Sequence, residues 1–187
     1  MNPIQIIIIS VAIALNSFVA YLTAGYVLQK EPVTKMLTYG FIMLVTHSLM
    51  IATGLWLGVR IGVLASNSNY YIAAGILLLM GLKIIFDSLK TKPEEKTFDL
   101  SETRVLIMLS IAEGVTPMII GIAIGLTVEA VFPSWSILLI TQSLALISGL
   151  VFGTLYGKNA LRLRTGPIGG LILLAASLKL LIDLIGF

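Results

Sequence analysis

Cysteine is absent from the chain, which excludes disulfide bonds and thiolate metal sites. Charged residues are scarce: they make up 11% of the 187 residues, against about 25% in an average soluble domain. Hydrophobic residues make up 58%. A soluble domain of this length could not bury so much apolar surface, so we expect the chain to lie in a lipid bilayer.

Motifs for ATP binding and for serine hydrolysis are missing as well. Without GxxxxGK[ST], any active transport by this chain must draw on an ion gradient. Without GxSxG, an enzyme is not expected. The net charge of +3 reports topology in a membrane protein. It does not indicate a nucleic-acid partner, and no cofactor is expected.

Six stretches are apolar over about 20 residues, the length that crosses the hydrocarbon core as a helix. They cover residues 4–28, 36–58, 70–89, 105–126, 135–156 and 166–185. Phe132, Pro133 and Ser134 separate the fourth from the fifth, and residues 90–104 form a long hydrophilic stretch. We therefore predict an all-α membrane protein with six transmembrane helices.

Lys and Arg residues gather in the loops after the first, third and fifth spans. These loops hold nine of them: Lys30, Lys35, Lys90, Lys92, Lys96, Arg104, Lys158, Arg162 and Arg164. Positively charged loops remain in the cytoplasm. We therefore expect a multi-pass protein of the bacterial inner membrane with both termini outside.

The sequence repeats itself at a distance of 95 residues. THSLMIATGLWLGVRIG at 46–62 corresponds to TQSLALISGLVFGTLYG at 141–157, with glycines at matching positions. LKIIFDSL at 82–89 corresponds to LKLLIDLI at 178–185, at a distance of 96 residues. Each half contains three spans, an odd number, so the second half enters the membrane from the opposite side. The chain is thus predicted to form two inverted three-helix repeats, at 1–92 and 104–187, joined by a cytoplasmic linker at 93–103.

Inverted repeats are the plan of many secondary transporters, whose binding site lies near the midplane where the repeats meet. The polar triplets that begin with Thr46 and Thr141 then face one pathway, with His47 and Gln142 as symmetry mates. Packing is the alternative, because Ser, Thr, Gln and His also form hydrogen bonds between membrane helices. The regularly spaced glycines indicate close packing, and such faces are compatible with a homodimer.

Glu113 lies well inside the fourth predicted span, where a charged group usually faces a cavity or a partner. Thr116 follows on the same helix face. Pro117 deprives the Glu113 carbonyl of its helical donor, and we expect a broken helix there. A carboxylate, a carbonyl and a hydroxyl are ligands that suit Mg, Ca or Mn. The alternative is a protonated Glu113 that is hydrogen-bonded across the bundle.

Further polar residues complete the candidate set. Asn16 is the repeat counterpart of Thr116 and offers an uncharged carbonyl ligand. His47 could bind metal or carry a proton, or be a buried structural histidine. Asp87 and Asp183 follow Lys83 and Lys179 by four residues, a spacing that favours local ion pairs. The predicted metal ligands are Asn16, His47, Glu113 and Thr116, and the predicted pathway-lining residues are Ser17, Thr46, Asp87 and Gln142.

The chain resembles the bacterial manganese efflux pump (MntP) family, within the LysE-type exporter superfamily that shares the 3+3 plan. The likeness rests on the opening MNPI, the triplet NSF at 16–18, the stretch GLWLG at 54–58 and the ending GGLILLAASLKLLIDL from Gly169. The resemblance implies a six-span exporter with Mn²⁺ as its substrate. Asp87 matches an acidic position of the family.

The sequence departs from the family pattern at three places. The family carries an Asp-Ala pair in spans one and four, where this chain has Asn16-Ser17 and Thr116-Pro117. It also carries an acidic residue in span two, about where His47 stands. The leading hypothesis is export of a divalent cation, with Glu113 in place of a lost carboxylate. An exporter of a small organic solute such as an amino acid, or a non-transporting membrane scaffold, is the alternative.

Overall fold

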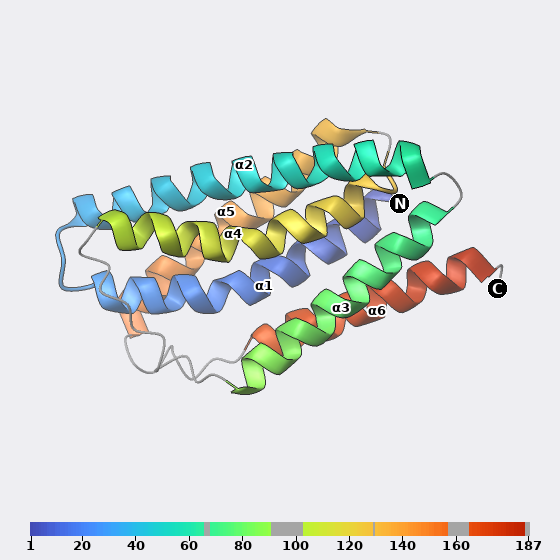
Figure 1. The fold of residues 1–187 in the computed structure, drawn as a ribbon. Helices are drawn as coiled ribbons and strands as arrows, with labels where there is room; N and C mark the ends of the chain where they lie inside the picture. The colour runs from blue at the N-terminus through green and yellow to red at the C-terminus, as the bar shows by residue number, and fades with distance from the viewer. Residues whose placement is uncertain (66–67, 91–102, 129, 157–164, 186–187) are drawn as a thin grey trace.

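The computed structural model describes residues 1–65, 68–90, 103–128, 130–156 and 165–185. Over these ranges the chain forms helices and no strand (Figure 1). The helices are α1 (Pro3–Leu28), α2 (Val33–Ala65), α3 (Asn69–Lys90), α4 (Thr103–Gly125), α5 (Val131–Tyr156) and α6 (Gly166–Ile185). All six are long and apolar enough to cross a membrane. The predicted all-α fold with six spans is confirmed.

Two expectations based on proline were wrong. Helix α4 continues without a break from Thr103 to Gly125, with Pro117 inside it. Pro117 still leaves the Glu113 carbonyl without its usual backbone donor. Residues 132–134 do not separate two spans either, because α5 already begins at Val131. Pro133 lies in the first turn of α5, where a backbone N–H has no helical partner to lose.

Helix α2 is longer than the sequence suggested. It spans 33 residues, or about 50 Å at 1.5 Å per residue, whereas the hydrocarbon core is about 30 Å thick. Arg60 lies inside the helix, and its guanidinium lies over the ring of Trp56, 5.5 Å from the ring centroid. Beyond it Val63 and Leu64 are 79% and 85% exposed.

The helices pack mainly in pairs that join the two halves of the chain. The most extensive contacts are those of α1 with α5, α2 with α4, and α3 with α6. Figure 1 shows α3 and α6 side by side along one side of the other four helices. Both termini lie at the same end of the bundle, as an even number of spans requires. Their location outside the cell stays a prediction.

Glycines allow two of these pairs to approach at backbone distance. A Cβ atom added to Gly58 on α2 would lie 2.8 Å from the Cα of Gly125 on α4. A Cβ added to Gly153 on α5 would lie 2.9 Å from the Cα of Gly25 on α1. Gly58 and Gly153 are counterparts in the predicted repeat, and Gly25 and Gly125 are related by the same 100-residue offset as Asn16 and Thr116. Equivalent positions thus make equivalent contacts, while the inverted repeat itself stays a prediction.

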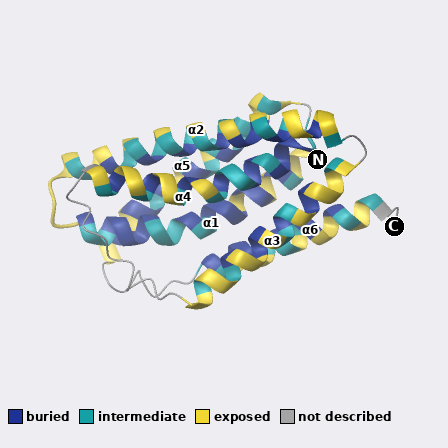
Figure 2. Ribbon diagram, in the orientation of Figure 1, coloured by how far each residue is buried: buried dark blue, intermediate teal, exposed yellow. Residues whose placement is uncertain are grey.

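The outer surface is apolar along most of the bundle. Exposed residues line the outward faces of the helices in Figure 2. Many of them are large and hydrophobic, such as Phe41, Leu49 and Leu155. So continuous an apolar surface is unfavourable in water, whereas lipid chains can cover it. The chain is therefore a multi-pass membrane protein.

Candidate functional site

The hydroxyl of Tyr21 connects His47 and Gln142, which correspond to each other in the predicted repeat. It lies 3.0 Å from Nδ1 of His47 on α2 and 3.3 Å from Oε1 of Gln142 on α5. All three side chains are buried, each 1% exposed. The two triplets that the sequence repeats therefore meet at one phenol from α1.

The direction of these hydrogen bonds fixes the chemistry of the imidazole. The single proton of the phenol is donated to Gln142 Oε1, which can only accept. The Tyr21 oxygen must then accept from His47, so Nδ1 carries the ring proton of the neutral imidazole. The lone pair of the ring is consequently on Nε2. This tautomer belongs to the amide orientation in which Oε1 of Gln142, and not Nε2, faces Tyr21.

Several buried polar atoms near this network have no hydrogen-bond partner among the described residues. They are Nε2 of His47, Nε2 of Gln142, Oγ of Ser17 and the hydroxyl of Tyr39. Ser17 precedes Tyr21 by one helical turn and lies close to its phenol, without a hydrogen bond of normal geometry. Unpaired buried polar groups are costly in a folded protein. Their presence indicates a place that water or a ligand can occupy.

Two apolar clusters lie on either side of this network. One contains Ile51 and Leu55 of α2 together with Leu138 of α5. The other contains Met43 of α2 together with Ala145 of α5. His47 and Gln142 fall between the clusters along their own helices. On α4 the second cluster reaches Leu109 and the first begins at Ile119. The interval between them contains Ser110, Glu113 and Thr116.

We call the polar side chains of this interval, together with the α1 residues Ser17 and Tyr21 at the second cluster, the polar layer. Its residues are Ser17 and Tyr21 on α1, Thr46 and His47 on α2, Ser110, Glu113 and Thr116 on α4, and Gln142 on α5. The layer lies near the middle of α4 and α5, hence near mid-bilayer if these helices span the membrane. Thr46 and Ser110 tie α2 to α4 across it, with 3.2 Å between their hydroxyl oxygens.

Glu113 brings a carboxyl group to the polar layer. It lies within electrostatic range of the phenols of Tyr21 and Tyr39. The next residue, Gly114, is buried against α2, and a Cβ added to it would lie 3.7 Å from Cδ2 of His47. Cδ2 is bonded to Nε2, so this side of the imidazole packs toward α4 near Gly114. No three His, Asp or Glu residues of the described chain come together as a metal-binding group.

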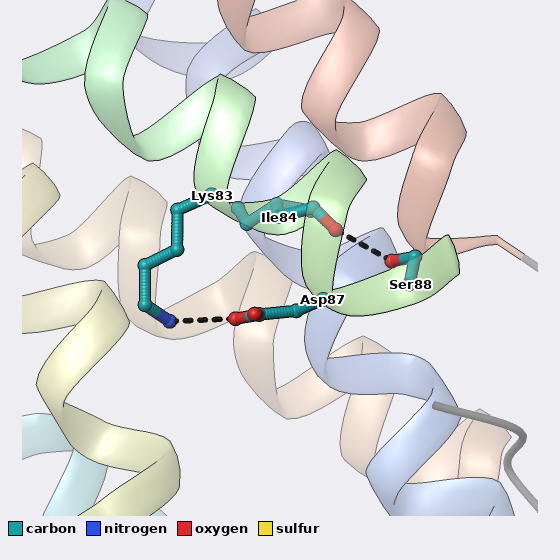
Figure 3. Close-up of polar contacts among 4 residues, drawn as sticks. All are labelled: Lys83, Ile84, Asp87 and Ser88. Carbon is teal, nitrogen blue, oxygen red and sulfur yellow. Dashed lines mark hydrogen bonds and ion pairs between the residues drawn. The ribbon is translucent and has the colours of Figure 1, made fainter. Parts of the chain in front are cut away.

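Asn16 and Asp87 were predicted as site residues but lie in other surroundings. Asn16 faces the start of α6, where a Cβ added to Gly166 would lie 4.0 Å from its Oδ1. Asp87 is exposed on α3 and accepts from Lys83 at 2.9 Å (Figure 3). Ser88 beside it donates to the carbonyl of Ile84. The predicted ion pair at the end of span three is confirmed, and Asp87 is not on a helix of the polar layer.

The corresponding ion pair on α6 does not form. Asp183 instead accepts a hydrogen bond from the amide of Gln5 on α1, at 3.1 Å. Lys179 lines a crevice of about 190 Å³ between α1 and α6, whose other walls are mainly apolar. No polar-layer residue lines this crevice.

Sequence reasoning missed Tyr21 and Ser110. A tyrosine in an apolar span resembles a core residue or an interface anchor, and Tyr21 does belong to an apolar cluster. The available signal was spacing, because Ser17 and Tyr21 lie one turn apart on α1 and share a face.

Comparisons with known proteins agree on one family. A family model described as "Putative manganese efflux pump" matches residues 30–181. Among similar proteins, "Putative manganese efflux pump MntP 1" of Wolinella succinogenes is 28% identical, with 96% of this chain and 97% of that protein covered. "Putative manganese efflux pump MntP" of Desulfitobacterium hafniense is 25% identical, with 100% and 98% covered. No solved structure matches the chain. With most of its length matched, the chain belongs to the manganese efflux pump (MntP) family.

Proposed function

We propose that this protein exports a divalent metal cation, with Mn²⁺ as a substrate, across the bacterial inner membrane. Membership in the family supports this function, as do the printed names of relatives that match over nearly the whole chain. Those names favour a metal ion over an organic solute. The family is one of transporters, in line with the expectation that the chain is not an enzyme.

The observation that carries the proposal is a polar layer enclosed by apolar clusters. A cation in the polar layer finds a carboxyl group, hydroxyl groups, an amide and an imidazole at mid-membrane depth. The apolar clusters on either side separate it from both aqueous compartments. Transport then requires that the packing opens on one side at a time. Such alternation is the working principle of folds built from inverted repeats.

Individual residues have distinct roles in this proposal. Glu113 supplies negative charge, Thr116 a hydroxyl and His47 the lone pair of Nε2, while Thr46, Ser17 and Gln142 line the pathway. Asn16 holds an uncharged oxygen at the approach between α1 and α6. Glu113 or His47 exchanges protons for the cation. Because the sequence has no ATP-binding motif, the export is driven by an ion gradient.

The test is Mn²⁺ efflux by Glu113→Gln beside Asp87→Asn as a matched control. Both substitutions neutralise an acid in a membrane helix, but only Glu113 lies in the polar layer. Proteoliposomes loaded with Mn²⁺ and given a proton gradient report the flux directly. We expect Glu113→Gln to abolish efflux and Asp87→Asn to retain most of it. Undiminished efflux in Glu113→Gln would show that the cation follows another route.

A further inference from the structure

The polar layer contains the one histidine of the sequence. Its Nε2 is buried and has no partner among the described residues. In the tautomer set by Tyr21, this atom carries a lone pair, because Nδ1 holds the proton. A buried lone pair that faces a polar interval is suited to a metal ion.

The opposite side of the ring is arranged as in established metal sites. A histidine that binds metal almost always donates its other N–H to an oxygen, which fixes the ring and raises its basicity. Tyr21 provides that oxygen at 3.0 Å. Tyr21 is itself anchored by its bond to Gln142 at 3.3 Å. The imidazole therefore has an oriented, outer hydrogen-bond partner before any ion arrives.

The remaining donors of the polar layer are poor in negative charge. Glu113 is its one carboxylate, and the described residues contain no cluster of three acidic or histidine side chains. Carboxylate, carbonyl and water ligands suit Mg, Ca and Mn, whereas imidazole suits Zn, Cu, Fe and Ni. Affinity for a nitrogen-containing site rises from Mn²⁺ through Co²⁺ and Ni²⁺ to Cu²⁺.

We propose that His47, held by Tyr21, is a metal ligand that shifts this transporter toward later first-row divalent cations such as Co²⁺ and Zn²⁺. This inference rests on the proposed function and narrows its substrate class. Tyr21 acts as a positioning residue: it does not touch the ion but keeps the lone pair on Nε2. Mn²⁺ remains a substrate, bound more weakly than these ions.

The experiment is isothermal titration of the purified full chain with Mn²⁺, Co²⁺ and Zn²⁺. The protein is isolated through a tag without histidine, so that His47 is the only imidazole present. The variants are His47→Asp, Tyr21→Phe and, as a matched control, Tyr39→Phe, which removes a buried hydroxyl that has no partner in the part of the chain that the structure describes. The quantity of interest is the ratio of the Co²⁺ affinity to the Mn²⁺ affinity.

We expect the wild type to bind Co²⁺ and Zn²⁺ more tightly than Mn²⁺. His47→Asp should lower the Co²⁺ to Mn²⁺ ratio by about tenfold or more, and Tyr21→Phe should weaken Co²⁺ binding by roughly tenfold. Tyr39→Phe should change neither. An unchanged ratio in His47→Asp, with Mn²⁺ still bound, overturns the inference and leaves the proposed function intact. No binding of any divalent cation by the wild type overturns both.

A second measurement needs no variant and covers the case in which His47→Asp fails to fold. Pulsed electron paramagnetic resonance of wild-type protein with one equivalent of Cu²⁺ detects the remote nitrogen of a coordinated imidazole. Because the chain has one histidine, that signal identifies His47 as a ligand. Bound Cu²⁺ without an imidazole signal contradicts the assignment.

Discussion

Two buried tyrosines allow a test at the scale of single residues. The Tyr21 hydroxyl has two partners, whereas that of Tyr39 has none among the described residues. We expect Tyr21→Phe to lower the free energy of unfolding by roughly 1–2 kcal/mol, because it leaves two buried polar atoms unpaired. Tyr39→Phe should cost nothing or stabilise the protein slightly. Thermal unfolding in one detergent gives both values.

Equal losses in the two variants would mean that the two hydrogen bonds of the Tyr21 hydroxyl contribute nothing measurable to stability. The comparison is informative because both rings are 1% exposed. Differences in packing volume therefore cancel to a good approximation.

Part of the polar layer could be predicted from the sequence. The 95-residue offset identified His47 and Gln142 as counterparts, and Glu113 was notable as an acid at membrane depth. Tyr21 could not be predicted as their link, because its role depends on α5 packing against α1. Asn16 was predicted as a site residue, but its side chain faces the start of α6. The sequence of the first span does not show that α6 packs there. A span's own sequence does not say which neighbour each face meets.

At the scale of helices, the close crossings depend on glycine. Gly58→Ala and Gly153→Ala each place a methyl group against the backbone of a partner helix. We expect each to lower the free energy of unfolding by about 1–3 kcal/mol or more, the usual cost of overpacking. Gly75→Ala is the matched control, because a Cβ there has no atom within 4 Å. The fraction of protein that remains monodisperse after heating reports the difference.

If Gly75→Ala proved as damaging as the two crossing variants, the loss of glycine itself would be the cause. A helix normally gains from Gly→Ala, by about 0.5–1 kcal/mol. The control should therefore be neutral or slightly stabilising.

The bounds of the helices were predictable where apolar stretches end at polar residues, as for α3, which begins at Asn69 and ends at Lys90. Helix α2 shows why they were not elsewhere. The 20-residue rule gives the minimum for a span, and the predicted span ended at residue 58. The structure continues to Ala65 through Arg60, whose charge lies over the ring of Trp56.

At the scale of the whole molecule, the two halves are interleaved. Each major contact joins a helix of residues 1–92 to a helix of residues 104–187. Neither half therefore has a packed core of its own. We expect residues 1–95 expressed alone to be degraded, and co-expression with residues 96–187 to restore both fragments. Co-purification through a tag on one fragment is the measurement.

Accumulation of residues 1–95 alone as a stable, monodisperse species would contradict this expectation. The repeat was visible in the sequence, but the interleaving was not. Membrane spans are apolar toward lipid and toward one another, so hydrophobic pattern does not distinguish the two faces.

The interleaving of the two halves also determines the order in which the contacts of the polar layer can form during synthesis. Tyr21 precedes Gln142 by 121 residues, which a ribosome covers in roughly 6–24 s at 5–20 residues per second. During that interval α1 and α2 are made while α5 does not yet exist. Tyr21 and His47, 26 residues apart, can then satisfy only each other. The first hydrogen bond of the polar layer is thus available early in translation, and the last waits until α5 has entered the membrane.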